Sequence, residues 1–129
     1  MTTTQAPPVT GERTRSMSSR PRFLQGVFSF EGQGLGDLAL LDPALTYVVP
    51  PDHEAQLVYF RGGNASDQLV TVVIMRDGEP MRYFPIAANG ATHVPLRIVD
   101  DLLANTKLEV FVGAEGSGQL VVDLGLVEI

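Results

Sequence analysis

The sequence predicts an all-β fold: an antiparallel β-sandwich of about eight or nine short strands, either immunoglobulin-like or jelly-roll-like. Short segments rich in β-branched and aromatic residues recur along the chain, with turn signals roughly every 8–12 residues. No segment keeps a helical period over three turns. The length of 129 residues fits one domain, which we place at residues 23–129.

The first half of the domain contains three segments that we expect to be short strands or apolar runs: residues 23–30, 38–41 and 45–49. Glycines end the first segment from Gly32 onward, and Asp42-Pro43 starts a turn after the second. The third stops at Pro50, because proline cannot donate to a strand ladder.

The two most strand-like segments are residues 54–61 and 68–76. Between them lies the sequence GGNASD, which predicts a hairpin-type connection because glycine, asparagine and aspartate favour turns. Residues 68–76 are almost continuously apolar. This predicts a central strand covered on both sides, by a facing sheet or by a partner.

Turn residues also divide the second half of the domain. Asp77-Gly78 predicts a two-residue hairpin, since a type I′ turn needs positive φ at both central positions. Pro95 places its short strand at a sheet edge. The remaining expectations are strands at residues 81–86, 91–96, 106–112 and 119–129, a turn at Asn89-Gly90, and one helical turn at residues 99–103 capped by Asn105.

The segment Leu103–Val112, followed by Gly116 and Gly118, resembles the late strands of immunoglobulin-like and fibronectin-type sandwiches. In those domains a capped turn leads into an alternating strand and then a glycine-bearing hairpin. The resemblance covers about the last quarter of the chain, and no Cys…Trp…Cys framework accompanies it. It implies a sandwich rather than a closed barrel, and it implies no function.

Charge is distributed unevenly along the chain. Residues 1–22 form an expected flexible basic arm of net charge +3, rich in Thr, Ser and Pro, whereas the rest of the chain carries −9. The acidic body argues against binding to nucleic acid, whose phosphates require clustered Lys and Arg. We expect the arm to be disordered or to lie on an acidic surface, its own or a neighbour's, through its four arginines: Arg13, Arg15, Arg20 and Arg22.

The cellular compartment is predicted from what the sequence lacks. The chain has no cysteine, its first twenty residues contain no apolar signal-peptide core, and no stretch approaches the ~18 apolar residues of a membrane span. We therefore expect a soluble, cytoplasmic protein.

Few residues are suited to catalysis or metal binding. In Asp52-His53-Glu54, neighbours on an extended chain point in opposite directions and cannot chelate one ion unaided, and His93 has no nearby carboxylate in sequence. There is no G-x-S-x-G elbow, and no Walker lysine follows Gly32. We predict no catalytic, metal or cofactor site.

Arginine and aromatic residues provide the one candidate binding site, on strands expected to lie near one another: Tyr59, Arg61, Arg82, Tyr83 and Phe84. If Arg61 and Arg82 shared a face with an aromatic ring, they could bind a carboxylate, a sugar or a partner's side chain. The alternative, which we favour, is that these arginines pair with acids of the body.

The predicted function is protein–protein association. The body is more apolar than a lone sandwich of this size needs, which is typical of a surface covered by a partner. We expect a non-catalytic accessory or structural subunit of a homo-oligomer or larger hetero-complex, such as a multi-subunit enzyme or a shell. The alternative is a small-ligand or carbohydrate-binding module, weakened by the absence of Trp. A small cupin-like metalloprotein or hydrolase comes third.

Overall fold

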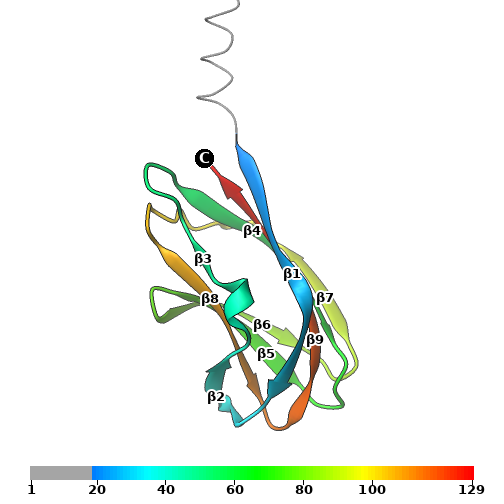
Figure 1. The fold of residues 1–129 in the computed structure, drawn as a ribbon. Helices are drawn as coiled ribbons and strands as arrows, with labels where there is room; N and C mark the ends of the chain where they lie inside the picture. Colours follow the sequence, from blue (N-terminus) through cyan, green and yellow to red (C-terminus); the bar gives the residue numbers. More distant parts are fainter. Residues whose placement is uncertain (1–18) are drawn as a thin grey trace, which may run out of the picture.

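The structure of the protein, a computed structural model, describes residues 19–129 and contains two antiparallel sheets packed face to face (Figure 1). This confirms the predicted all-β sandwich. The four-stranded sheet has the order β1 (Arg20–Glu31), β9 (Ser117–Glu128), β4 (Ala55–Asn64), β7 (Ala91–Pro95). The five-stranded sheet has the order β2 (Gly34–Leu40), β8 (Lys107–Ala114), β5 (Val70–Arg76), β6 (Glu79–Ile86), with β3 (Tyr47–Val48) also pairing with β8.

The strands pair as one long hairpin that has been rolled up. β5 pairs with β6 at its tip, and then β4 pairs with β7, β2 with β8 and β1 with β9, all antiparallel. The tip is the predicted hairpin turn, in which Asp77 and Gly78 both have positive φ, 50° and 84°. Because successive pairs alternate between the two sheets, the topology is that of a jelly roll, one of the two predicted arrangements.

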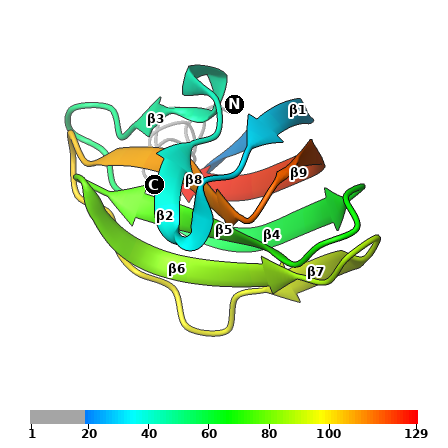
Figure 2. The ribbon, with the colours of Figure 1, turned by 90° about the horizontal axis from the view of Figure 1, so that it is seen from below.

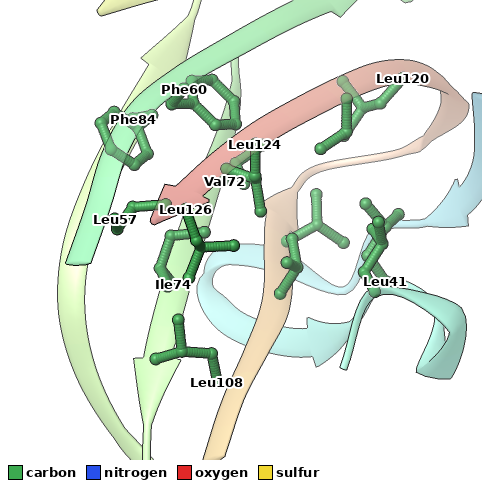
Figure 3. Close-up of a cluster of buried hydrophobic side chains, with 14 of the residues drawn as sticks. Leu41, Leu57, Phe60, Val72, Ile74, Phe84, Leu108, Leu120, Leu124 and Leu126 are labelled. Atoms are coloured by element: carbon green, nitrogen blue, oxygen red, sulfur yellow. The ribbon is translucent and has the colours of Figure 1, made fainter. Parts of the chain in front are cut away.

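The hydrophobic core lies between the sheets and follows the strand alternation (Figure 3). Val72 and Ile74 of β5 face Leu124 and other buried residues of the opposite sheet. Phe60 and Phe84 stack across the core with ring centroids 4.3 Å apart. The predicted central strand is confirmed over Val70–Arg76, because β5 lies between β8 and β6, whereas residues 68 and 69 precede the strand.

The segment GGNASD is not the predicted hairpin, because β4 and β5 belong to different sheets. Gly62, Gly63 and Asn64 extend β4, and the chain then crosses to the other sheet. The buried Asn64 amide organises this crossing, since its Nδ2 donates to the carbonyls of Gln68, Ile86 and Ala87. Its Oδ1 accepts from the backbone N–H and hydroxyl of Ser66.

Three further expectations differ locally from the structure. β1 begins at Arg20 rather than Phe23, so the last part of the expected arm is strand. Residues 99–103 form no helical turn, because Leu102 instead exchanges backbone hydrogen bonds with Ala55. A 3-10 turn, η1 (Pro43–Leu45), forms where we expected only a turn, and the Asp42 side chain caps it by accepting from the Ala44 N–H at 2.8 Å.

β7 lies at the edge of its sheet, as Pro95 predicted. Across residues 19–129 we find no helix of the length and apolarity needed to cross a membrane.

Candidate functional site

The side of the four-stranded sheet that faces away from the core, called here the outer face, carries a group of polar and charged side chains that lie side by side. Strand pairing aligns one residue from each strand in a polar row across it. From β1 to β7, the row consists of Gln25, Asp123, Arg61 and His93.

Asp123 is the centre of this row. Its Oδ1 accepts hydrogen bonds from Gln25 Nε2 at 3.0 Å and from the Tyr59 hydroxyl at 2.8 Å. Its Oδ2 lies 3.8 Å from an Arg61 guanidinium nitrogen, too far for a hydrogen bond. One carboxylate oxygen is therefore used within the molecule, and the other faces a guanidinium that remains more than half exposed.

Tyr59 is held in place by its neighbours on the sheet. Its ring lies over Gly125, where a Cβ would be only 2.0 Å from a ring carbon, so the site requires a glycine. The Arg61 guanidinium lies 5.8 Å from the ring centroid, and His93 meets the ring edge-on at 6.2 Å. Burial, and then the hydrogen bond to Asp123 and its negative charge, raise the pKa of Tyr59, which keeps the phenol a neutral donor.

Apolar side chains flank the polar row. Phe23, Val27 and Val121 are 56%, 64% and 53% exposed. Val27 and Val121 are directly opposite each other on β1 and β9, and Phe23 lies opposite Gly125 on the other side of the row. The outer face thus combines a fixed polar row with uncovered apolar surface.

A hollow of about 420 Å³ opens beside this row, over β4, β7 and β9. Its lining residues are Arg61, Gly62, Ala91, Thr92, His93, Val121 and Asp123. It offers guanidinium donors, a carboxylate acceptor and an imidazole beside the apolar Val121. Ala91 lies opposite Gly63, so neither of these two positions carries a large side chain beside the hollow.

The five sequence-predicted partner residues do not form one site. Tyr59 and Arg61 belong to the outer face, whereas Tyr83 is exposed on β6 of the other sheet and Phe84 is buried in the core. Arg82 lies 3.2 Å from Asp100 and donates to the Ile98 carbonyl, so it fastens β6 to the loop after β7. The arginine–acid pairing that we favoured is present for both Arg61 and Arg82.

The four arginines predicted to make arm contacts also do not lie together in one described segment. Arg13 and Arg15 lie outside the described residues, whereas Arg20 and Arg22 belong to β1. Arg22 Nε is 3.1 Å from Oε2 of the buried Glu128, which also accepts from the Tyr47 hydroxyl at 2.5 Å. Burial alone would raise the pKa of Glu128, but the bonds from Tyr47 and Arg22 and the nearby positive charges outweigh it and lower this pKa. Arg22 is therefore a structural residue.

Sequence reasoning missed Gln25, Asp123 and the exposed Phe23, Val27 and Val121. A signal for Asp123 was present: it is the single charge in the apolar run of residues 118–127. For the histidines, His53 lies in the turn before β4 with Nδ1 3.1 Å from the Pro51 carbonyl. Between residues 19 and 129, no group of three or more His, Cys, Asp or Glu side chains lies close enough together to hold a metal ion.

Comparison with known proteins identifies the fold. No family model and no curated protein matches the sequence. Among solved structures, the chain is similar to the CBM36-1 domain of a multidomain xylanase from the hindgut metagenome of Trinervitermes trinervoides, with a TM-score of 0.52 and 16% identity over 84% of this chain and 96% of that one. It is also similar to VP2 of an infectious bursal disease virus subviral particle, with a TM-score of 0.51 and 12% identity over 86% of this chain and 32% of that one. At such identities these likenesses establish the β-sandwich fold alone.

Proposed function

We propose that this protein is a non-catalytic β-sandwich that acts through protein–protein association, as an accessory or structural subunit of a larger assembly. The observation that carries the proposal is the uncovered apolar surface of the outer face, formed by Phe23, Val27 and Val121. Large side chains left this exposed on one regular sheet face are typical of a surface that a partner covers.

The polar row supports the same proposal by supplying specificity. Asp123 is held by Gln25 and Tyr59, and beside it the Arg61 guanidinium stays more than half exposed and loosely paired, so both offer charge toward a partner. A partner that covers the apolar residues must also match this charge pattern. The host assembly is proposed as a multi-subunit enzyme or a shell, with the basic residues Arg13 and Arg15 contacting an acidic neighbour.

The proposal is tested by changing the apolar surface of the outer face and measuring association of the full chain. Val121→Lys should weaken association by about tenfold or more, because burying a valine contributes roughly 1.5 kcal/mol. Val48→Lys is the matched control, since Val48 is 51% exposed but lies on β3 of the other sheet. Size exclusion with light scattering, with purification from the native host, measures the complex. A full chain that is monomeric and partnerless in its host would contradict the proposal.

A second candidate function is binding of a small polyhydroxylated ligand, such as a carbohydrate, and the hollow beside Arg61 favours it. Sugar hydroxyls need donors and acceptors side by side, and Arg61 and Asp123 offer both beside the apolar Val121. The fold is also similar to that of the CBM36-1 domain of a multidomain xylanase.

This candidate is tested by thermal shift with oligosaccharides of xylose and of glucose. Arg61→Ala should abolish a ligand-induced shift without lowering the unliganded melting temperature, since Arg61 is exposed and only loosely paired. Tyr83→Ala is the control, because Tyr83 is exposed on the other sheet. A shift that survives Arg61→Ala would place any binding elsewhere.

A further inference from the structure

The sandwich has four sheet edges, and two of them are blocked by proline. β7 is short and ends at Pro95, and β6 contains Pro80 and Pro85. Proline lacks the N–H that an added strand would need, so proline on an edge strand prevents further pairing.

The third edge, beside β8, is irregular. β2 and β3 share it, and η1 lies between them along the chain. The pairing of β2 with β8 shifts register between Gly34 and Ala39. Such an irregularity interrupts the regular row of N–H and C=O groups that a second strand would need.

The fourth edge, β1, has none of these protections along most of its length. It is 12 residues long and pairs with β9 at every position without a register shift. Its one proline, Pro21, lies near its start. Figure 2 shows β1 at the margin of its sheet, beyond β9. Within residues 19–129, β1 is therefore the one long, regular edge strand.

The pairing pattern identifies which backbone groups of β1 point outward. Just beyond the end of β9, Ile129 exchanges backbone bonds with Glu54, and within β9 Gln119 accepts from Ala65, so odd-numbered residues of β9 bond toward β4. Even-numbered residues of β9 therefore bond toward β1, where their partners are also even-numbered. The outward N–H and C=O groups belong to the odd-numbered residues of β1: Phe23, Gln25, Val27 and Ser29.

The side chains of these odd-numbered residues lie on the outer face. Two copies of β1 can therefore pair through their outward backbone groups and bring these side chains next to each other. If two copies of β1 pair antiparallel about a twofold axis at Gln25, odd residues oppose odd residues. Phe23 then lies opposite Val27 of the other copy, twice. The Arg20 end of each strand also lies beside the Glu31 end of the other.

We propose that β1 of one chain pairs antiparallel with β1 of a second copy, joining two four-stranded sheets into one continuous sheet across a homodimer. The inference rests on the proposed function of association and names the partner and the edge. It places the exposed Phe23 and Val27 of the two copies against each other and satisfies the outward amides.

The main test is hydrogen exchange of the full chain, measured by NMR at several protein concentrations alongside light scattering. The amides of Phe23, Gln25, Val27 and Ser29 should be protected in the dimer and should exchange faster on dilution. The even-numbered amides of Leu24 and Phe28 are the internal control, because they bond to β9 in either state.

A proline substitution tests the edge directly. Gln25→Pro removes an outward N–H at the twofold axis, once in each copy, and leaves the backbone bonds to β9 intact, although the side-chain bond to Asp123 is lost. It should weaken dimerisation by about tenfold or more, since two hydrogen bonds are lost. Gln25→Ala is the matched control, because it removes the same side chain and its bond to Asp123 but keeps the N–H, so Gln25→Pro should dimerise about tenfold or more weakly than Gln25→Ala.

Other outcomes overturn the inference in distinguishable ways. If the chain associates while the odd-numbered amides exchange freely, edge pairing is wrong and association through another surface stands. If those amides are protected in the monomer, another part of the same chain covers the edge. A chain that is monomeric at all concentrations and also partnerless in its host overturns both this inference and the proposed function.

Discussion

The two outward sides of the sandwich expose the same kind of residue to very different degrees. Val73 points away from the core on β5, because its neighbours Val72 and Ile74 point into it, yet Val73 is fully buried. Val27 also points outward, from β1, and is largely exposed. Both are valines in regular strands, so the residue type does not explain the difference.

Neighbouring side chains and an irregular strand explain the burial of Val73. Its cross-strand partners are Phe111 on β8 and Tyr83 on β6, one on each side. The irregular part of β2 also folds over Gly113 of β8, where an added Cβ would lie 2.5 Å from the Leu35 carbonyl oxygen. The centre of the five-stranded sheet is thus covered by its own chain, although Val48 and Tyr83 at its margins stay exposed, whereas Val27 and Val121 of the four-stranded sheet are left uncovered. An outward apolar residue indicates an interface only where the chain leaves it uncovered.

The sharpest test of this contrast places a charge on each face. Val73→Asp should lower the free energy of unfolding by about 3 kcal/mol, because it buries an unpaired carboxylate. Val121→Asp should change it by less than about 0.5 kcal/mol, since Val121 is exposed. Urea unfolding at low protein concentration measures both. Equal effects would show that the two sides are covered alike.

The next largest change in stability is expected from substituting two glycines, one on the outward side of each sheet. Gly113→Ala should cost about 2 kcal/mol, because its Cβ would overlap backbone of β2. Gly63→Ala on the outer face should leave stability unchanged or raise it, because the nearest atom to its Cβ is a Val121 carbon at 3.6 Å. Thermal unfolding measures both, and a tolerated Gly113→Ala would contradict the covering role of β2.

The hydrogen bond from Tyr47 of β3 to Glu128 of β9 joins the two sheets, and it predicts that the free energy of unfolding depends on pH. The pKa of Glu128 is lowered in the folded protein, so its contribution to stability is present above its unfolded pKa of about 4.5 and is lost as pH falls through its folded pKa. Unfolding measured from pH 7 to pH 3 should therefore show stability decreasing on acidification. In Glu128→Gln the loss of stability on acidification should be smaller. A pH profile of stability identical to that of the wild type would show that Glu128 is not its source.

The smallest expected changes in stability come from removing the arginine of each of the two arginine–acid pairs. Arg61→Ala on the outer face should cost less than about 0.5 kcal/mol, because its pair with Asp123 is long and exposed. Arg82→Ala should cost more, about 1 kcal/mol, since Arg82 also donates to a backbone carbonyl. Chemical unfolding ranks them, and the reverse order would mean that Arg61 is part of the fold rather than available to a partner.

Local chemistry in the sequence was enough to predict most strands. Asp77-Gly78 formed the expected hairpin because glycine and aspartate tolerate the positive φ that the turn requires. Pro95 marked an edge because it lacks a donor. The candidate site was predicted only in part: Tyr59 and Arg61 lie on the outer face, but Asp123, the centre of the site, was missed because its partners come from strands far away in sequence.

The sequence by itself determined which segments become strands and which side chains share a face, since alternation has a period of two residues and needs only local information. Only the tertiary structure decided which sheet each strand joins, because strand neighbours depend on contacts between distant segments. That is why GGNASD, expected to turn back into a hairpin, instead carries the chain from one sheet to the other. For the same reason Arg61 and Arg82 lie in different sheets, and β1 is an open edge within the described residues 19–129.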